Sequence, residues 1–123
     1  MSSIQTFDEM FLKRRDFRYY EPTEYFKDIF NKTMILLNEI LPNNKPITAF
    51  NNSMLSGTVI FQLPGVDIEI EECASNKPEK RNNIRYEISY MIPMTEIKRC
   101  EGFSKKNDAW FEEFSSHLRN ISF

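Results

Sequence analysis

Apolar side chains recur every three or four residues over residues 22–41, and this spacing predicts an amphipathic helix. Pro22 suits the first helical position because its missing N–H would have no partner there in any case. The stripe that would face the core consists of Phe26, Ile29, Phe30, Thr33, Leu37 and Ile40. We expect Phe26, Phe30 and Leu37 to pack against a sheet.

Shorter helical patterns lie near both ends of the chain. Thr6 and Glu9 have the spacing of a capping box, in which each side chain bonds the backbone N–H of the other, so we expect a first helix beginning at Thr6. After Gly102, an apolar stripe predicts a last helix. The stripe consists of Phe111, Phe114, Leu118 and Ile121, with Trp110 beside it.

Between these helices, apolar and polar side chains alternate with the period of two that is typical of β-strands. Pro64 and Gly65 separate two of the alternating runs and fit the central positions of a type II turn, where glycine accepts a positive φ. These two runs therefore predict a hairpin with one buried face and one solvated face. The runs cover residues 47–50, 55–63, 66–71 and 84–92, and a weaker one covers 95–100.

The order of these elements predicts an α+β fold. Two N-terminal helices precede an antiparallel meander of three to five strands, and a C-terminal helix follows, with the helices packed on one sheet face. Residues 1–123 are expected to form a single globular domain, since domains commonly have about 100–150 residues.

The composition favours a core that needs neither a metal nor a disulfide. Hydrophobic residues make up 41% of the chain and phenylalanine occurs 11 times, which excludes a disordered chain. Cys73 and Cys100 do not form a CxxC pair, so we expect reduced thiols and no metal site. Because there is no signal-peptide pattern and no apolar run of roughly 18 residues, we expect a cytoplasmic protein without membrane contact.

Acidic side chains are concentrated in one segment, although the net charge is only −2. The segment 46–73 has no Lys or Arg, and its acids are Asp67, Glu69, Glu71 and Glu72. Alternation places the first three on one strand face, about 6.5–7 Å apart, and Glu72 extends this row into an anionic surface. Such a row is unfavourable by itself, which indicates a binding surface for a cationic partner. The alternative is a solvated face that Arg85 neutralises from a neighbouring strand.

Trp110 is the second candidate for a partner contact. It lies one position off the apolar stripe of the last helix, so its ring is available to a partner if the stripe faces the core. Tryptophan is among the residues that dominate binding hot spots. The alternative is packing in the core or at its boundary.

Familiar catalytic motifs are missing from the sequence. There is no GxSxG, GxxxxGK[ST], GxGxxG or HExxH, so we expect no catalytic residues, no cofactor and no enzyme activity. One alternative is a small enzyme in which Cys73 or Cys100 is the nucleophile and His117 is the base. Another is a cross-strand carboxylate pair of the kind that glycosidases use, formed among Glu69, Glu71 and Glu87.

A basic and aromatic cluster over residues 13–20 has the residue types that contact phosphates and stack on bases. Acidic neighbours offset its charge, and a pI near 5.5 argues against a nucleic-acid partner.

These features together favour a non-enzymatic protein-binding module. We expect a bacterial inhibitor or immunity protein that neutralises a basic toxin or effector, such as a nuclease, through its acidic surface. The alternatives are a secretion or effector chaperone and a phage-encoded inhibitor of host defence. A chaperone would be dimeric and would present exposed apolar patches.

Overall fold

The computed structural model describes residues 5–11, 22–53, 56–73, 83–91, 94–103 and 109–121. The basic and aromatic cluster that the sequence predicts at 13–20 lies outside these ranges. The helices are α1 (Phe7–Phe11), α2 (Glu24–Ile40) and α3 (Ala109–Arg119). The strands are β1 (Ile47–Asn52), β2 (Ser56–Leu63), β3 (Val66–Cys73), β4 (Asn83–Met91) and β5 (Met94–Phe103).

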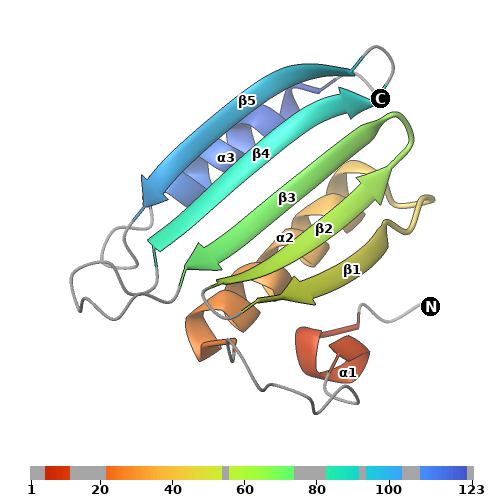
Figure 1. Cartoon of the computed structure of the whole chain (residues 1–123). Helices are drawn as coiled ribbons and strands as arrows, with labels where there is room; N and C mark the ends of the chain where they lie inside the picture. The colour runs from red at the N-terminus through yellow and green to blue at the C-terminus, as the bar shows by residue number, and fades with distance from the viewer. Residues whose placement is uncertain are drawn as a thin grey trace.

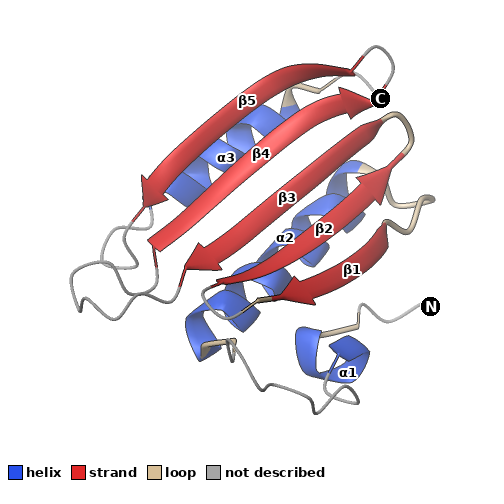
Figure 2. Cartoon of the chain, in the orientation of Figure 1, coloured by secondary structure: helices blue, strands red, loops and turns tan. Residues whose placement is uncertain are grey.

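The strands form one antiparallel sheet in the order β1-β2-β3-β4-β5, so each strand pairs with its neighbours in sequence (Figure 1). This arrangement confirms the predicted α+β class and the antiparallel meander, with five strands. The last strand is longer than the weak run at 95–100 suggested. Viewed with the sheet in front, α2 and α3 lie behind it (Figure 2). None of the described helices is long and apolar enough to cross a membrane.

The turn between β2 and β3 is the one that the sequence predicts. Leu63 pairs with Val66 across a two-residue loop, and Gly65 has a φ of 77°. That value belongs to the second central position of a type II turn, where an L side chain is strained. A Cβ atom at Gly65 would meet nothing within 4 Å, so the backbone conformation rather than space favours glycine here.

Helix α2 begins two residues later than predicted. Thr23, not Pro22, sets the boundary, because the Thr23 hydroxyl accepts a hydrogen bond from the N–H of Phe26 at 3.1 Å and caps the helix. The expected inward face is confirmed: Phe26, Phe30 and Leu37 are fully buried. The Phe30 ring stacks on Phe61 of β2 at a centroid distance of 5.3 Å, which joins the helix to the sheet.

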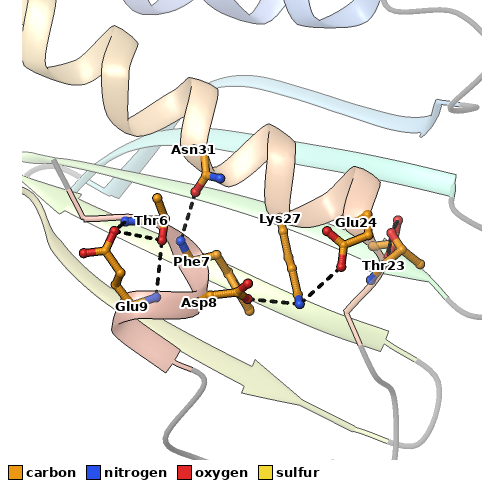
Figure 3. A network of polar contacts seen from close by, with 9 residues as sticks. Thr6, Phe7, Asp8, Glu9, Thr23, Glu24, Lys27 and Asn31 are labelled. Carbon is orange, nitrogen blue, oxygen red and sulfur yellow. Dashed lines mark hydrogen bonds and ion pairs between the residues drawn. The ribbon is translucent and has the colours of Figure 1, made fainter.

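The predicted capping box holds the start of α1, a helix of only five residues. The Thr6 N–H donates to Glu9 Oε1, and the Glu9 N–H donates to Thr6 Oγ1, each at 3.3 Å. Two polar contacts tie α1 to α2 (Figure 3). The Phe7 N–H donates to Asn31 Oδ1 at 2.9 Å, and Lys27 Nζ lies 3.0 Å from an Asp8 carboxylate oxygen.

The predicted inward stripe of α3 is confirmed at Phe114, Leu118 and Ile121, but Trp110 rather than Phe111 is its fourth buried position. Its buried side chains are Trp110, Phe114 and Leu118, while Phe111 is only half-buried. The rings of Trp110 and Phe114 lie 6.1 and 4.9 Å from the Tyr86 ring of β4. The spacing 110, 114, 118 continues to Ile121, so one face of the helix accounts for all the buried positions.

Candidate functional site

Side chains that are paired across antiparallel strands point to the same side of a sheet, and the register therefore defines two faces. The inner face is buried: its members include Val59, Phe61, Ile68, Ile70 and Ile88. No described helix lies over the opposite face, which we call the outer sheet face (Figure 1). Its central residues are Thr58, Ile60 and Gln62 of β2, Asp67, Glu69 and Glu71 of β3, Arg85, Glu87 and Ser89 of β4, and Arg99 of β5.

The predicted acidic row is present on the outer sheet face. Asp67, Glu69 and Glu71 alternate with buried isoleucines along β3, and all three carboxylates retain solvent exposure. Across the strand pair, Asp67 lies opposite Ser89, whereas Glu71 lies opposite Arg85. The three acids therefore share a face but not an environment.

Glu71 is fully occupied by its neighbours. Arg85 Nε forms an ion pair with Glu71 Oε1, and the Thr58 hydroxyl donates to Glu71 Oε2 at 3.1 Å. The Cys73 thiol also donates to Glu71, at 3.4 Å. The sequence left open that Arg85 neutralises the acidic row, and in the structure Arg85 forms its ion pair with Glu71.

Glu69 faces a carboxylate rather than a cation, because it lies directly across from Glu87. Among the described residues, Glu69 forms no ion pair, while Arg99 lies 3.9 Å from Glu87. Partial burial raises the pKa of Glu69, and the negative charges of Glu87, Asp67 and Glu71 raise it further, against a smaller lowering by Arg85. The centre of the outer sheet face is therefore a carboxylate in an unfavourable electrostatic position.

We predict that neutralising Glu69 raises the free energy of unfolding, and that this increase depends on pH. Because the folded chain holds the Glu69 proton more tightly than the unfolded chain, stability falls as pH rises from the ordinary pKa of 4.5 through the raised folded pKa. Glu69→Gln removes that fall. At neutral pH the variant should therefore be more stable than the wild type by about 0.2–1 kcal/mol, the scale of a cross-strand charge pair.

Urea unfolding of both proteins at about pH 4 and pH 7 measures the effect, since the gain should be present only at the higher pH. Glu96→Gln is the matched control, because Glu96 lies opposite Ser89 rather than another carboxylate. An equal gain for Glu69→Gln at both pH values would contradict the repulsion.

Glu72 does not belong to the acidic row, and its predicted exposure is wrong. Its side chain is 0% exposed because its even position in β3 places it on the inner face with Ile70. The Thr23 hydroxyl lies 2.9 and 2.8 Å from the two Glu72 carboxylate oxygens, and the Thr23 N–H donates at 3.4 Å. Glu72 therefore holds the N-terminus of α2, where a negative charge is favourable.

Trp110 is likewise inside the protein, so its predicted role as an exposed anchor is wrong. The side chain is 2% exposed, and its Nε1–H donates to the hydroxyl of Tyr25 at 3.1 Å. Its ring packs beside Tyr86 and Phe114. In this structure Trp110 joins α3 to α2 and the sheet and offers no surface to a partner.

The candidate catalytic groups are not brought together. Cys73 contacts Glu71 on the outer sheet face, whereas His117 lies on α3 behind the sheet and 3.5 Å from Glu113. Burial and the adjacent Glu71 raise the pKa of the Cys73 thiol, which keeps it protonated at neutral pH. Cys73 is a free thiol, and the side chain of Cys100 lies outside the described part of the chain. No group of His, Cys, Asp or Glu in the described ranges could hold a metal ion.

A shallow hollow of about 150 Å³ opens on the outer sheet face. It is lined by Thr58, Glu69, Glu71, Arg85, Glu87 and Arg99. It is polar and open, and its lining residues include both members of the Glu69–Glu87 pair. The sequence located Glu69, but its cross-strand partner emerges only when the register of β3 and β4 is known.

Comparisons with protein families, with curated proteins and with solved structures find no match to this chain.

Proposed function

We propose that this chain is a non-enzymatic protein-binding module: an inhibitor or immunity protein that neutralises a basic toxin in the bacterial cytoplasm. The observation that carries the proposal is the pairing of Glu69 with Glu87 on a sheet face that no described helix covers. Like charges in direct opposition destabilise the free protein. A cationic side chain from a partner, placed between them, would turn that repulsion into attraction.

A nuclease is the kind of toxin that best fits this surface. Its substrate cleft is electropositive because it binds phosphates, and a row of carboxylates can occupy the same cleft. Long-range attraction would also speed the encounter, which matters for an inhibitor that must act before the toxin does.

The chemistry of the described residues supports binding rather than catalysis. The Cys73 thiol has a raised pKa, which opposes its use as a nucleophile, and His117 lies on the far side of the sheet. The large apolar side chains that are exposed in the described ranges are Ile35, Ile47 and Met91, which lie on three different elements. A chaperone for extended segments would instead present a continuous apolar patch.

Charge reversal on the outer sheet face tests the proposal. The immobilised chain is used to capture a partner from the native cell, and the partner is then identified by mass spectrometry and purified. The double variant Glu69→Lys/Glu71→Lys should lower the association rate constant by about tenfold or more at low salt. The wild-type rate should itself fall steeply as salt rises, since exposed charges are screened beyond about 8–10 Å near physiological ionic strength.

The matched control is Glu39→Lys/Glu112→Lys, which changes the net charge equally but places both lysines on exposed helix positions. Its association rate should change much less than that of the double variant. Glu69→Lys alone keeps the test valid if loss of the Glu71 contacts unfolds the double variant. Salt-independent association, or equal rates for the two double variants, would leave the acidic row as an ordinary solvated face.

A further inference from the structure

We propose that the partner segment on the outer sheet face is an amphipathic α-helix that lies along β3 and carries Lys or Arg side chains four residues apart. This inference rests on the proposed function and specifies the shape of the partner. Three arguments support it. Two carboxylates are available to a partner, an apolar strip lies beside them, and the face of a sheet offers no backbone hydrogen bonds.

The available carboxylates are those of Asp67 and Glu69. Glu71 is occupied by Arg85, Thr58 and Cys73, whereas neither Asp67 nor Glu69 forms an ion pair with any described residue. Outward positions on a strand repeat at about 6.5–7 Å. Side chains at i and i+4 of an α-helix rise by about 6 Å along its axis, so two such basic residues can reach the two carboxylates together.

An apolar strip lies beside these carboxylates on the outer sheet face. Ile60 of β2 is directly opposite Glu69 on one side and Ala49 of β1 on the other. Ile47, at the start of β1, is 69% exposed. Neighbouring strands are about 4.8 Å apart, so a helix about 10 Å wide covers the acidic row and part of the apolar strip at once. The partner helix therefore needs an apolar flank next to its basic residues.

The backbone N–H and C=O groups of the partner segment also need hydrogen-bond partners. A sheet face presents side chains, not the free N–H and C=O groups of an edge, so the backbone groups of an extended segment lying across it would find no backbone partners in this protein. A helix satisfies these groups internally. The inner face of this sheet already carries helices, which run roughly along the strands in Figure 1.

Charge disfavours two other occupants of this face. A second copy of this chain that docked through the same face would bring its own carboxylates toward Asp67 and Glu69. A nucleic acid would bring a line of phosphates. Both would be repelled by the carboxylates that a basic helix would neutralise.

Two synthetic peptides test the shape of the partner. The matched peptide is an alanine-based helix with Lys at i and i+4 and Leu at i+3 and i+7, which places the two residue types on adjoining flanks. The control peptide has the same composition with the lysines two residues apart, so that they point to opposite sides of the helix. Circular dichroism checks that both peptides are helical, and each is titrated into the ¹⁵N-labelled full chain.

The matched peptide should bind about tenfold more tightly than the control, a difference of about 1.4 kcal/mol, and should shift the amide signals of residues 58–62 and 66–71 most. Glu69→Lys should weaken its binding by a similar factor, and Glu112→Lys should not. Equal affinities for the two peptides, no binding of the matched peptide, or shifts centred on another surface would overturn the inference.

A failure of this inference is distinguishable from a failure of the proposed function. If the captured partner still loses association rate with Glu69→Lys/Glu71→Lys while the peptides bind equally, the partner uses the acidic face with a segment of another shape. If the captured partner is also insensitive to the charge reversal, the acidic face is not the binding surface at all.

Discussion

Replacing Phe30 with alanine should lower the free energy of unfolding by about 3–5 kcal/mol, the usual range for truncating a buried phenylalanine. The Phe30 ring is fully buried and lies where three elements meet. Its centroid is 5.5 Å from that of Phe7, 5.6 Å from that of Phe11 and 5.3 Å from that of Phe61. Truncation would leave a cavity among α1, α2 and β2 that rigid ring neighbours fill poorly.

Chemical denaturation followed by circular dichroism measures the loss. Ile35→Ala is the control, because Ile35 lies on the same helix but is 49% exposed. This control should change the free energy of unfolding by no more than about 0.5 kcal/mol. A loss below about 1 kcal/mol for Phe30→Ala would show that Phe30 is not part of the core.

Replacing Trp110 with alanine should likewise cost about 3–5 kcal/mol of folding free energy. The indole is buried between α2 and the sheet, and its Nε1–H is bonded to the Tyr25 hydroxyl. If Trp110 were the partner contact that the sequence suggested, this substitution would instead weaken partner binding. Because the ring is buried, we expect the substitution to lower the stability of the fold. The association and dissociation rates of a captured partner should change only to the extent that the chain unfolds.

Trp110→Phe separates the two contributions of the side chain, because it keeps an aromatic ring and removes only the hydrogen bond and part of the volume. Its loss should be clearly smaller than that of Trp110→Ala. Phe111→Ala is the positional control, since Phe111 is the neighbouring half-buried ring. Circular dichroism is the suitable signal, because Trp110 is the only tryptophan. A Trp110→Ala loss no larger than that of Phe111→Ala would place Trp110 outside the core.

Local regularities in the sequence were enough to locate most of the elements. The three- and four-residue spacing of Phe26, Phe30 and Leu37 identified α2 and its inward face, because a helix repeats every 3.6 residues. Alternation located the strands, and Pro64 and Gly65 identified the β2–β3 turn. Each of these signals depends on the conformation of a few neighbouring residues, which is why no knowledge of the tertiary structure was needed.

Glu72 and Trp110 show where local regularity was not sufficient. The alternation already placed Glu72 on the face of Ile70, but its charge argued for exposure. Thr23, 49 residues away, donates hydrogen bonds that help to make the burial of this carboxylate tolerable. For Trp110, the sequence left two ways to turn the last helix. The bond to Tyr25, 85 residues away, and the Tyr86 ring belong to the orientation in which Trp110 faces inward.

Alternation along the strand is enough to place Asp67, Glu69 and Glu71 on one exposed strand face, because strand side chains alternate with a period of two. The difference between these carboxylates follows from the pairing of the strands, which the alternation does not reveal. The register of β3 with β4 places Arg85 opposite Glu71 and Glu87 opposite Glu69, so that one acid is neutralised and its neighbour is repelled. Register depends on pairing between segments that are distant along the chain, and the electrostatic character of each carboxylate depends on that pairing.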